Sequence, residues 1–143
     1  MKRLLARIQM YAVWVSVLAL SLAVAAPLVA GSRITDVTVE QGRELMQRRA
    51  GQTDFIILDV RTPEEFAEGH LTGAVNLNLL APDFAARLGA FDRGKTYLVY
   101  CRSGNRSTKA VQVMERLEFR SVSHMVEGIL GWQKKGFPLS RTQ

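Results

Sequence analysis

Two short apolar runs constrain the fold of this chain most strongly. Residues 55–60 and 96–100 are nearly continuous in apolar, β-branched and aromatic side chains. Such runs are typical of strands buried on both faces, as in a parallel sheet covered by helices. Shorter runs at 74–77 and 122–126 predict two further strands. Because helical patterns separate these strands, we expect an α/β fold with a central, mainly parallel sheet and helices on both of its faces.

The helices are predicted from capping residues and from apolar spacing. Thr38 and Gln41 have the spacing of a capping box. Thr62 and Glu65 repeat that spacing, with Pro63 at the first helical position. A further helix carries an amphipathic stripe formed by Ala110, Val113, Met114 and Leu117. The expected helices cover about 38–49, 62–69, 82–88, the region of 110–117, and 129–135.

The first thirty residues have the composition of an export signal. The run from Ile8 to Ala30 carries no charged residue, and it follows three cations: Lys2, Arg3 and Arg7. A basic start, an apolar middle and a small-residue end form the pattern that export signals share. Ala23 and Ala25 fit the small-x-small pattern of a cleavage site, yet the run of 23 residues is also long enough to cross a bilayer.

We therefore expect residues 1–31 to be a signal peptide or a signal anchor, followed by one domain at residues 32–143. In both cases the cations keep the start of the chain in the cytoplasm, so the domain is expected to be exported to the periplasmic side. It is soluble there if the segment is cleaved and inner-membrane-anchored if it is retained, and it contacts the membrane only through this segment. A buried core helix is the alternative interpretation.

The charge and the cysteine content exclude several classes of protein. The net charge is +6, and without the three N-terminal cations sixteen basic and thirteen acidic residues remain, which is too mild an excess to predict nucleic acid binding. Cys101 is the single cysteine, so it has no partner for a disulfide within the chain. With only two histidines, a structural zinc site is not expected. We predict no metal and no cofactor.

The loop that begins at Cys101 carries the chemistry. Cys101 follows the predicted strand 96–100 directly, which places it at the carboxyl edge where parallel sheets bind ligands. Gly104 and Asn105 tolerate positive φ, so the loop can curl with its N–H groups pointing inward, and Asn105 or Ser107 can cap the following helix. Together with the cations of Arg102 and Arg106, this cradle favours a thiolate and binds an anion.

Three sequence blocks of this chain resemble those of rhodanese domains. They are residues 59–66, from Asp59 to Phe66; residues 69–77, from Gly69 to Leu77; and residues 101–107, from Cys101 to Ser107. The ending from Gly128 to Pro138 is similar to the final helix of that family, so the likeness covers about residues 35–139. One difference is Glu127-Gly128, where the family usually has two glycines. This difference leaves the local geometry at the rim of the site open.

The resemblance implies a rhodanese-like three-layer fold with about five strands and sulfur transfer in two steps. The catalytic Cys101 thiolate would take a sulfur atom from a small anionic donor such as thiosulfate and become a persulfide. An acceptor, cyanide in the assay or a thiol in the cell, would remove that sulfur, with ping-pong kinetics. Arg102 and Arg106 would hold the donor. The backbone amides implied to hold the persulfide are those of Ser103, Gly104, Asn105, Arg106 and Ser107.

Two other functions compete with sulfur transfer. Phosphatases and arsenate reductases of the related fold have arginine six positions after the cysteine, whereas here Arg106 is five positions after Cys101 and the sixth position is Ser107. A loop one residue shorter forms a smaller cradle, which suits a sulfur atom better than a phosphate. The second alternative is a non-catalytic rhodanese-like binding module. Such modules commonly lack the cysteine, so the presence of Cys101 favours an enzyme.

Four further residues are candidates for supporting roles. Asp59 and Arg61 lie at the end of strand 55–60, at the same edge of the sheet as Cys101. We expect Asp59 to accept hydrogen bonds from loop amides or from an arginine and so to fix the cradle, in preference to acid–base catalysis. For His70 we expect a structural hydrogen bond at its turn. For Trp132 we expect core packing with a possible share in a pocket wall.

Overall fold

The computed structural model describes residues 31–141. Residues 1–30, which make up nearly all of the predicted signal peptide or anchor, lie outside the described residues, as do the last two residues. Within 31–141, no helix has both the length and the apolar character needed to cross a membrane.

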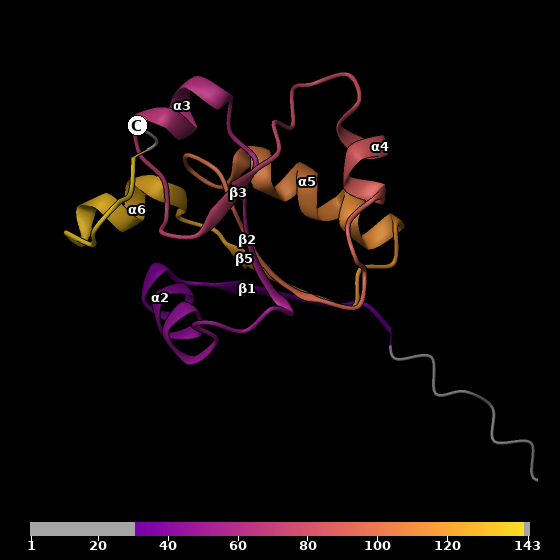
Figure 1. Ribbon diagram of the computed structural model, residues 1–143, viewed down its shortest axis with the longest axis horizontal. Coiled ribbons are helices and arrows are strands. Elements are labelled where there is room, and N and C mark those ends of the chain that lie inside the picture. The colour runs from indigo at the N-terminus through magenta and orange to yellow at the C-terminus, as the bar shows by residue number, and fades with distance from the viewer. Residues whose placement is uncertain (1–30, 142–143) are drawn as a thin grey trace, which may run out of the picture.

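Five parallel strands form one sheet in the order β1-β5-β4-β2-β3 (Figure 1). The strands are β1 Arg33–Val37, β2 Phe55–Asp59, β3 Ala74–Asn76, β4 Thr96–Tyr100 and β5 Ser121–Met125. The predicted parallel α/β sheet is therefore confirmed. Strand β4 occupies the centre, with β2 and β5 as its neighbours, so the carboxyl ends of these three strands meet at one edge.

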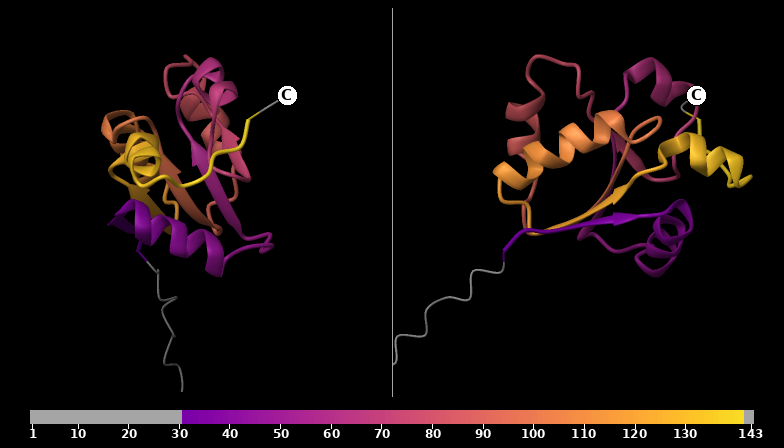
Figure 2. Two further views of the ribbon diagram at one scale, coloured as in Figure 1. Left: turned by 90° about the vertical axis from the view of Figure 1, so that its left-hand side faces the viewer. Right: turned by 180° about the vertical axis from the view of Figure 1, so that it is seen from behind.

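Helices cover both faces of the sheet and complete the three layers (Figure 2). The helices are α2 Val39–Arg48, α3 Pro63–Glu68, α4 Phe84–Gly89, α5 Asn105–Arg116 and α6 Gly128–Lys134. Helices α4 and α5 pack on one face, and α2 and α6 pack on the other. Helix α3 lies at the carboxyl edge, directly after β2 (Figure 1).

The two helices predicted from capping threonines begin where they were expected. Thr38 caps α2 and Thr62 caps α3, and in both helices the reciprocal capping box is complete. Pro63 is the first residue of α3. Helix α4 differs from its prediction: it begins at Phe84 instead of residue 82, and its N-cap residue makes no capping hydrogen bond with its side chain.

Strand β1 is the element that the apolar pattern does not reveal. It is an edge strand that pairs only with β5, and its side chains are mostly exposed. Because an edge strand with one partly covered face needs few apolar residues, its composition resembles that of a loop. Its register places Asp36 directly opposite His124 of β5.

The alternation of side chains along β4 determines the direction of Cys101. Tyr97 and Val99 point into the apolar core beneath α4 and α5, and Leu98 and Tyr100 point into the core beneath α2 and α6. All four side chains are fully buried. Cys101 continues the first of these rows, so its sulfur lies on the α5 side of the sheet, where the next helix begins.

Candidate active site

The loop from Cys101 to α5 is short because Gly104 adopts a conformation that favours glycine. Gly104 is the N-cap residue of α5 and has φ +95°. A Cβ atom at this position would lie 2.3 Å from the carbonyl oxygen of Val126, so the close approach of the β5 end also requires glycine. The prediction that Asn105 or Ser107 caps α5 is wrong. The helix starts at Asn105 itself, and no side chain caps it.

The sulfur of Cys101 is held at the start of α5. Cys101 is 1% exposed. The backbone N–H of Gly104 donates to Sγ at 3.1 Å, and the hydroxyl of Ser107 lies 3.3 Å from Sγ as a second donor. Donors at a helix N-terminus stabilise negative charge, so the surroundings of the sulfur suit an anion.

Opposing effects act on the pKa of Cys101. Burial raises the pKa, because removing the thiolate from water is unfavourable. Hydrogen bonds from the Ser107 hydroxyl and from the amides of Ser107, Ser103 and Gly104 lower it by more. The result is a pKa below the ordinary value of a thiol, which increases the fraction of thiolate available as a nucleophile.

The two arginines predicted to hold a donor are placed differently. Arg106 forms a bidentate ion pair with Glu65 of α3, with N–O distances of 2.6 and 2.8 Å. Glu65 also accepts the backbone N–H of Thr62, so this pair joins the loop to the start of α3. Arg102 is exposed, and it borders a depression of about 260 Å³ together with Arg61 and Glu68. Arg102 is therefore a solvent-exposed cation directly after Cys101 in the loop.

The ion pair between Glu65 and Arg106 leads to a prediction about stability and pH. The hydrogen bond from Arg106 lowers the pKa of Glu65 to about 2. In the unfolded chain the pKa of a glutamate is about 4.3. Because folding lowers this pKa, the ion pair stabilises the folded state fully at pH values above about 4.3. The stabilisation is lost as the pH falls towards 2 and the carboxylate becomes protonated. We expect Glu65→Gln to reduce the free energy of unfolding by roughly 2 kcal/mol at pH 7, discounted for partial exposure.

Urea unfolding at several pH values measures this effect. The difference in the free energy of unfolding between the Glu65→Gln variant and the original protein should decrease as the pH is lowered from about 6 to about 3, because the Glu65 carboxylate becomes protonated. Glu68→Gln is the matched control, since Glu68 is exposed on the same helix. A difference that is independent of pH, or one equal to that of the control, would contradict the prediction.

Asp59 and Arg61 form a buried ion pair beside the loop. Asp59 is 0% exposed and Arg61 is 5% exposed. The guanidinium donates to the carboxylate at 2.6 Å and to the carbonyl oxygen of Gly69 at 2.7 Å. Asp59 thus accepts hydrogen bonds from an arginine, which is one of the two kinds of partner expected for it. The pair holds the β2–α3 connection, and Glu65 of the following helix α3 reaches Arg106.

The start of α6 supports the loop from its other side. The N–H groups of Ile129 and Leu130 donate to the carbonyl oxygens of Cys101 and Arg102 at 2.9 and 3.1 Å. Gly128 has φ +60° and packs against the same two carbonyl groups.

The structure explains why this chain has Glu127 where rhodanese domains usually have the first of two glycines. Glu127 has an ordinary helical φ of −82°, so this position does not need glycine. Its carboxylate accepts the N–H of Val39 at 2.9 Å, which satisfies a free donor at the start of α2. Gly128, not residue 127, is the position at which close packing requires glycine.

A second chain of hydrogen bonds reaches the sulfur from behind, and sequence reasoning missed it. Ser107 Oγ lies 2.8 Å from Nε2 of His124. Nδ1 of His124 lies 2.9 Å from Oδ1 of Asp36. Strand alternation places His124 on the same face of the sheet as Val122 and Cys101. This alternation is the feature of the sequence that could have indicated a contact between His124 and the cysteine loop. The alternation alone is not sufficient, because the contact also requires that β5 lies beside β4.

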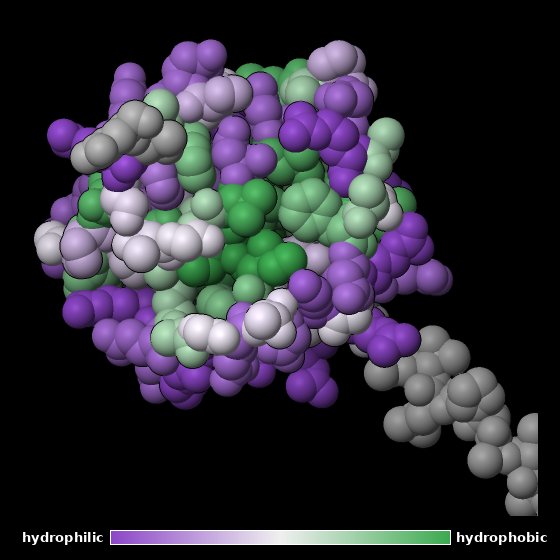
Figure 3. Space-filling model, viewed as in Figure 1, coloured by the Kyte–Doolittle hydropathy of each residue, from purple (hydrophilic) through white to green (hydrophobic). Residues whose placement is uncertain are grey.

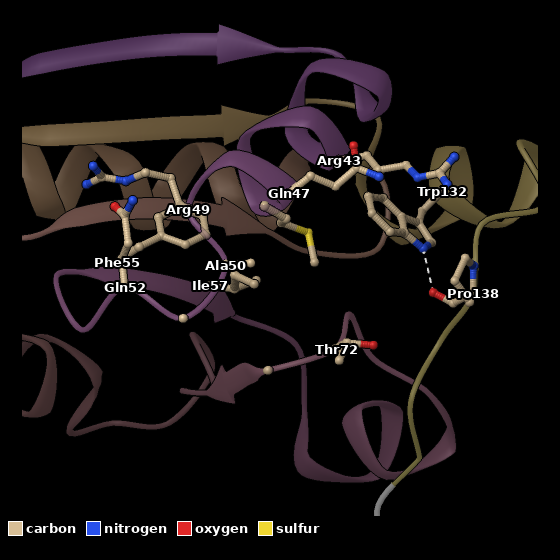
Figure 4. Close-up of a pocket in the computed structure, with 13 residues that line it drawn as sticks. Arg43, Gln47, Arg49, Ala50, Gln52, Phe55, Ile57, Thr72, Trp132 and Pro138 are labelled. Atoms are coloured by element: carbon tan, nitrogen blue, oxygen red, sulfur yellow. Dashed lines mark hydrogen bonds between the residues drawn. The ribbon is translucent and has the colours of Figure 1, made fainter.

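A cavity between α2 and the sheet lies away from Cys101. It measures about 520 Å³, with Phe55, Ile57 and Trp132 among its walls (Figure 4). Apolar side chains gather on this side of the molecule, between α2 and the β3 edge (Figure 3). The described lining residues include no cysteine, histidine or carboxylate.

His70 and Trp132 have structural contacts. Nδ1 of His70 lies 2.8 Å from the carbonyl oxygen of Phe66, and the two rings are stacked with centroids 3.8 Å apart. Trp132 is 3% exposed and its indole N–H donates to the carbonyl oxygen of Pro138 at 2.9 Å. These contacts fix the turn after α3 and the packing of the C-terminal segment.

Comparisons with known proteins identify the family of this chain. The rhodanese-like domain family matches residues 41–135. The chloroplastic thiosulfate sulfurtransferase 16 of Arabidopsis thaliana is 37% identical over 91 residues, which cover 57% of this chain and 76% of that protein. An uncharacterized protein of Synechocystis sp. is 34% identical over 116 residues, or 80% of this chain, and the match spans 62% of its length, less than two thirds.

A crystal structure shows the same fold. The rhodanese-like domain protein from Staphylococcus aureus is 25% identical and superposes with a TM-score of 0.61, covering 76% of this chain and 99% of that one. The parallel five-stranded sheet, the cysteine loop after its central strand and the match over residues 41–135 lead to one conclusion. This chain belongs to the rhodanese-like domain family.

Proposed function

We propose that this protein is a sulfurtransferase that moves a sulfur atom from a small anionic donor, such as thiosulfate, to a thiol or cyanide acceptor through a persulfide on Cys101. One observation carries the proposal: the sulfur of Cys101 accepts the N–H of Gly104 at 3.1 Å and has the Ser107 hydroxyl at 3.3 Å. A thiol in that setting has a lowered pKa and is prepared to act as a nucleophile. The name of the Arabidopsis relative supports the same activity.

The reaction divides into two balanced steps. In the first, the Cys101 thiolate attacks the outer sulfur of thiosulfate, an S–S bond forms, and the S–S bond of the donor breaks. Sulfite leaves with that electron pair, and the enzyme carries a Cys101 persulfide anion. In the second, a thiolate or cyanide attacks the outer sulfur of the persulfide. The bond to Sγ breaks, the electron pair returns to Cys101, and the acceptor leaves as a persulfide or as thiocyanate.

The charges around the loop suit these steps. The loop amides that stabilise the thiolate also suit a persulfide anion, since the negative charge moves outward by only one sulfur atom. The exposed side chain of Arg102 attracts a dianionic donor and the leaving sulfite. Arg106 contributes mainly through its ion pair with Glu65, which keeps the loop against α3. No proton needs to be transferred in either step.

Incubation with thiosulfate, followed by intact-protein mass spectrometry, tests the proposal. We expect one sulfur atom to be added per chain, on the peptide that contains Cys101, and to be removed by cyanide with release of thiocyanate. A parallel assay with an aryl phosphate tests the phosphatase alternative, and no hydrolysis is expected. Hydrolysis of the phosphate without formation of a persulfide would replace the proposal by that alternative. The absence of both activities would favour the binding module.

We further propose that residues 1–31 direct the domain to the periplasmic side. The support for this is the charge-free run from Ile8 to Ala30 behind three cations. The mass of the protein recovered from cells distinguishes the two forms of the proposal. A start near residue 26 indicates a cleaved signal peptide, and a full-length chain in the membrane fraction indicates a retained anchor. Full-length protein in the cytosol would contradict both forms.

A further inference from the structure

Four polar side chains from four different parts of the fold form one line that ends at the reactive sulfur. Cys101 follows β4, Ser107 lies in the first turns of α5, His124 lies in β5, and Asp36 lies in β1. Successive separations are 3.3 Å from Sγ to Oγ, 2.8 Å from Oγ to Nε2, and 2.9 Å from Nδ1 to Oδ1. Ser107 is fully buried and His124 is 5% exposed, so the contacts of Ser107 with Cys101 and His124 are shielded from competing water.

The Ser107 hydroxyl has more acceptors than hydrogen atoms. It carries one hydrogen, yet three groups lie within reach: Sγ of Cys101, Nε2 of His124, and the carbonyl oxygen of Gly104 at 2.9 Å. The protonation state of Nε2 decides whether that nitrogen competes for the hydrogen. The number of donors on the sulfur therefore depends on His124, although His124 does not touch the sulfur.

Asp36 determines which nitrogen of His124 carries a hydrogen. A carboxylate only accepts, so Nδ1 must be the donor in the contact with Oδ1. In neutral His124 the lone pair is then on Nε2, and it takes the Ser107 hydrogen away from the sulfur. In charged His124, Nε2 donates to Oγ and leaves the Ser107 hydrogen free for the thiolate. Two hydrogen-bond arrangements of the same atoms thus exist, and they differ by one proton.

We propose that His124, held by Asp36, is a positioning residue that sets the direction of the Ser107 hydroxyl and thereby tunes the charge and nucleophilicity of Cys101. The proposal rests on the proposed sulfur transfer for its role in turnover, and its effect on the thiol can be measured without any donor. When His124 is charged, the thiolate has an extra donor and is stabilised. When His124 is neutral, the thiolate loses that donor and becomes more nucleophilic.

Few charged groups surround His124 to complicate this coupling. It borders a cavity of about 300 Å³ behind the loop. Among the described residues that line this cavity, the ionisable ones are His124 and Asp36, and Cys101 is reached through Ser107. The side chain of Asp36 is 71% exposed, which gives His124 a partner in contact with solvent for proton exchange. Position 36 thus connects the buried line of side chains to water.

The rate of alkylation of Cys101 by iodoacetamide, followed from about pH 4 to about pH 10, tests the proposal. For the original protein we expect two steps, one for the ionisation of the thiol and one for His124. His124→Gln retains an amide that can reach Ser107 but does not titrate, so a single step is expected. In Asp36→Asn the charged form of His124 loses its carboxylate, so its step should move to lower pH.

His70→Asn is the matched control, because it removes the other histidine of the chain, whose ring contacts Phe66 instead of the loop. This variant should keep both steps. Two steps in His124→Gln, or an unmoved step in Asp36→Asn, would overturn the proposal. Because alkylation needs no sulfur donor, a failure to form a persulfide with thiosulfate would reject the proposed function and leave this result intact.

A second measurement uses the original protein alone and does not depend on the folding of a variant. The chemical shift of the His124 ring proton can be titrated before and after alkylation of Cys101. By reciprocity, removing the thiolate charge should move the titration of His124 to lower pH, and His70 provides the internal reference. A His124 titration that is identical in both forms would overturn the proposal.

Discussion

Replacement of Cys101 by serine is expected to abolish sulfur transfer while leaving the fold intact. Serine has nearly the same size and can accept the same hydrogen bonds from Gly104 and Ser107. Its hydroxyl is not ionised at neutral pH and cannot carry the transferred sulfur as a persulfide. We expect the rate of thiocyanate formation from thiosulfate and cyanide to fall at least about a thousandfold, as for the loss of a covalent nucleophile.

Two measurements separate loss of the nucleophile from loss of structure. The urea midpoint of Cys101→Ser should lie close to that of the original protein, because the substitution changes one buried atom. Lys109→Ala, at an exposed position on α5, is the control for a substitution near the loop and should retain activity. A Cys101→Ser variant that keeps more than about a tenth of the rate would show that the thiolate is not the nucleophile.

Replacement of Gly128 by alanine is expected to destabilise the protein strongly, although it adds only one methyl group. A Cβ atom at Gly128 would lie 2.4 Å from the carbonyl oxygen of Arg102 and 2.6 Å from that of Cys101. Both contacts are with backbone, so the loop or α6 must move. With the strain of φ +60° added, we expect the free energy of unfolding to fall by at least about 3 kcal/mol.

Gly136 offers a matched control for this effect. It has φ +69°, but a Cβ atom there would meet no other atom within 4 Å. Gly136→Ala should therefore show the backbone strain alone, about 1 kcal/mol. Urea unfolding measures the free energy of unfolding of both variants. The larger loss in Gly128→Ala is caused by the contact between the added Cβ atom and the cysteine loop. Equal losses in both variants would show that α6 does not press against the cysteine loop as described.

The parts of the fold that depend on local chemistry could be predicted from sequence. Thr38 and Thr62 mark helix starts because their capping interactions join residues only three positions apart. Strand β4 is recognisable because a strand buried on both faces must be apolar throughout. Cys101 could be placed at the site because it follows that strand directly.

The parts that depend on strand order could not be predicted. Strand β1 has the polar composition of an edge, and only pairing with β5 makes it a strand. Asp36 and His124 are 88 residues apart in sequence, and their contact exists only because β1 lies beside β5. The pairing of Arg106 with Glu65 likewise crosses 41 residues. The sequence therefore could not show that Arg106, one of the two cations expected to bind the donor, is paired with Glu65.

The burial of Cys101 also affects what can oxidise it. A disulfide between two copies of the chain would require their Cα atoms to approach within about 7 Å. Cys101 is 1% exposed, while Arg102 and Asn105 on the same loop are exposed, so the loops of two copies would collide before their sulfurs met. The like charges of the two Arg102 side chains oppose that approach as well. The burial of Cys101 thus shields it from pairing with another protein thiol, which helps a chain with a single cysteine to keep that cysteine reduced.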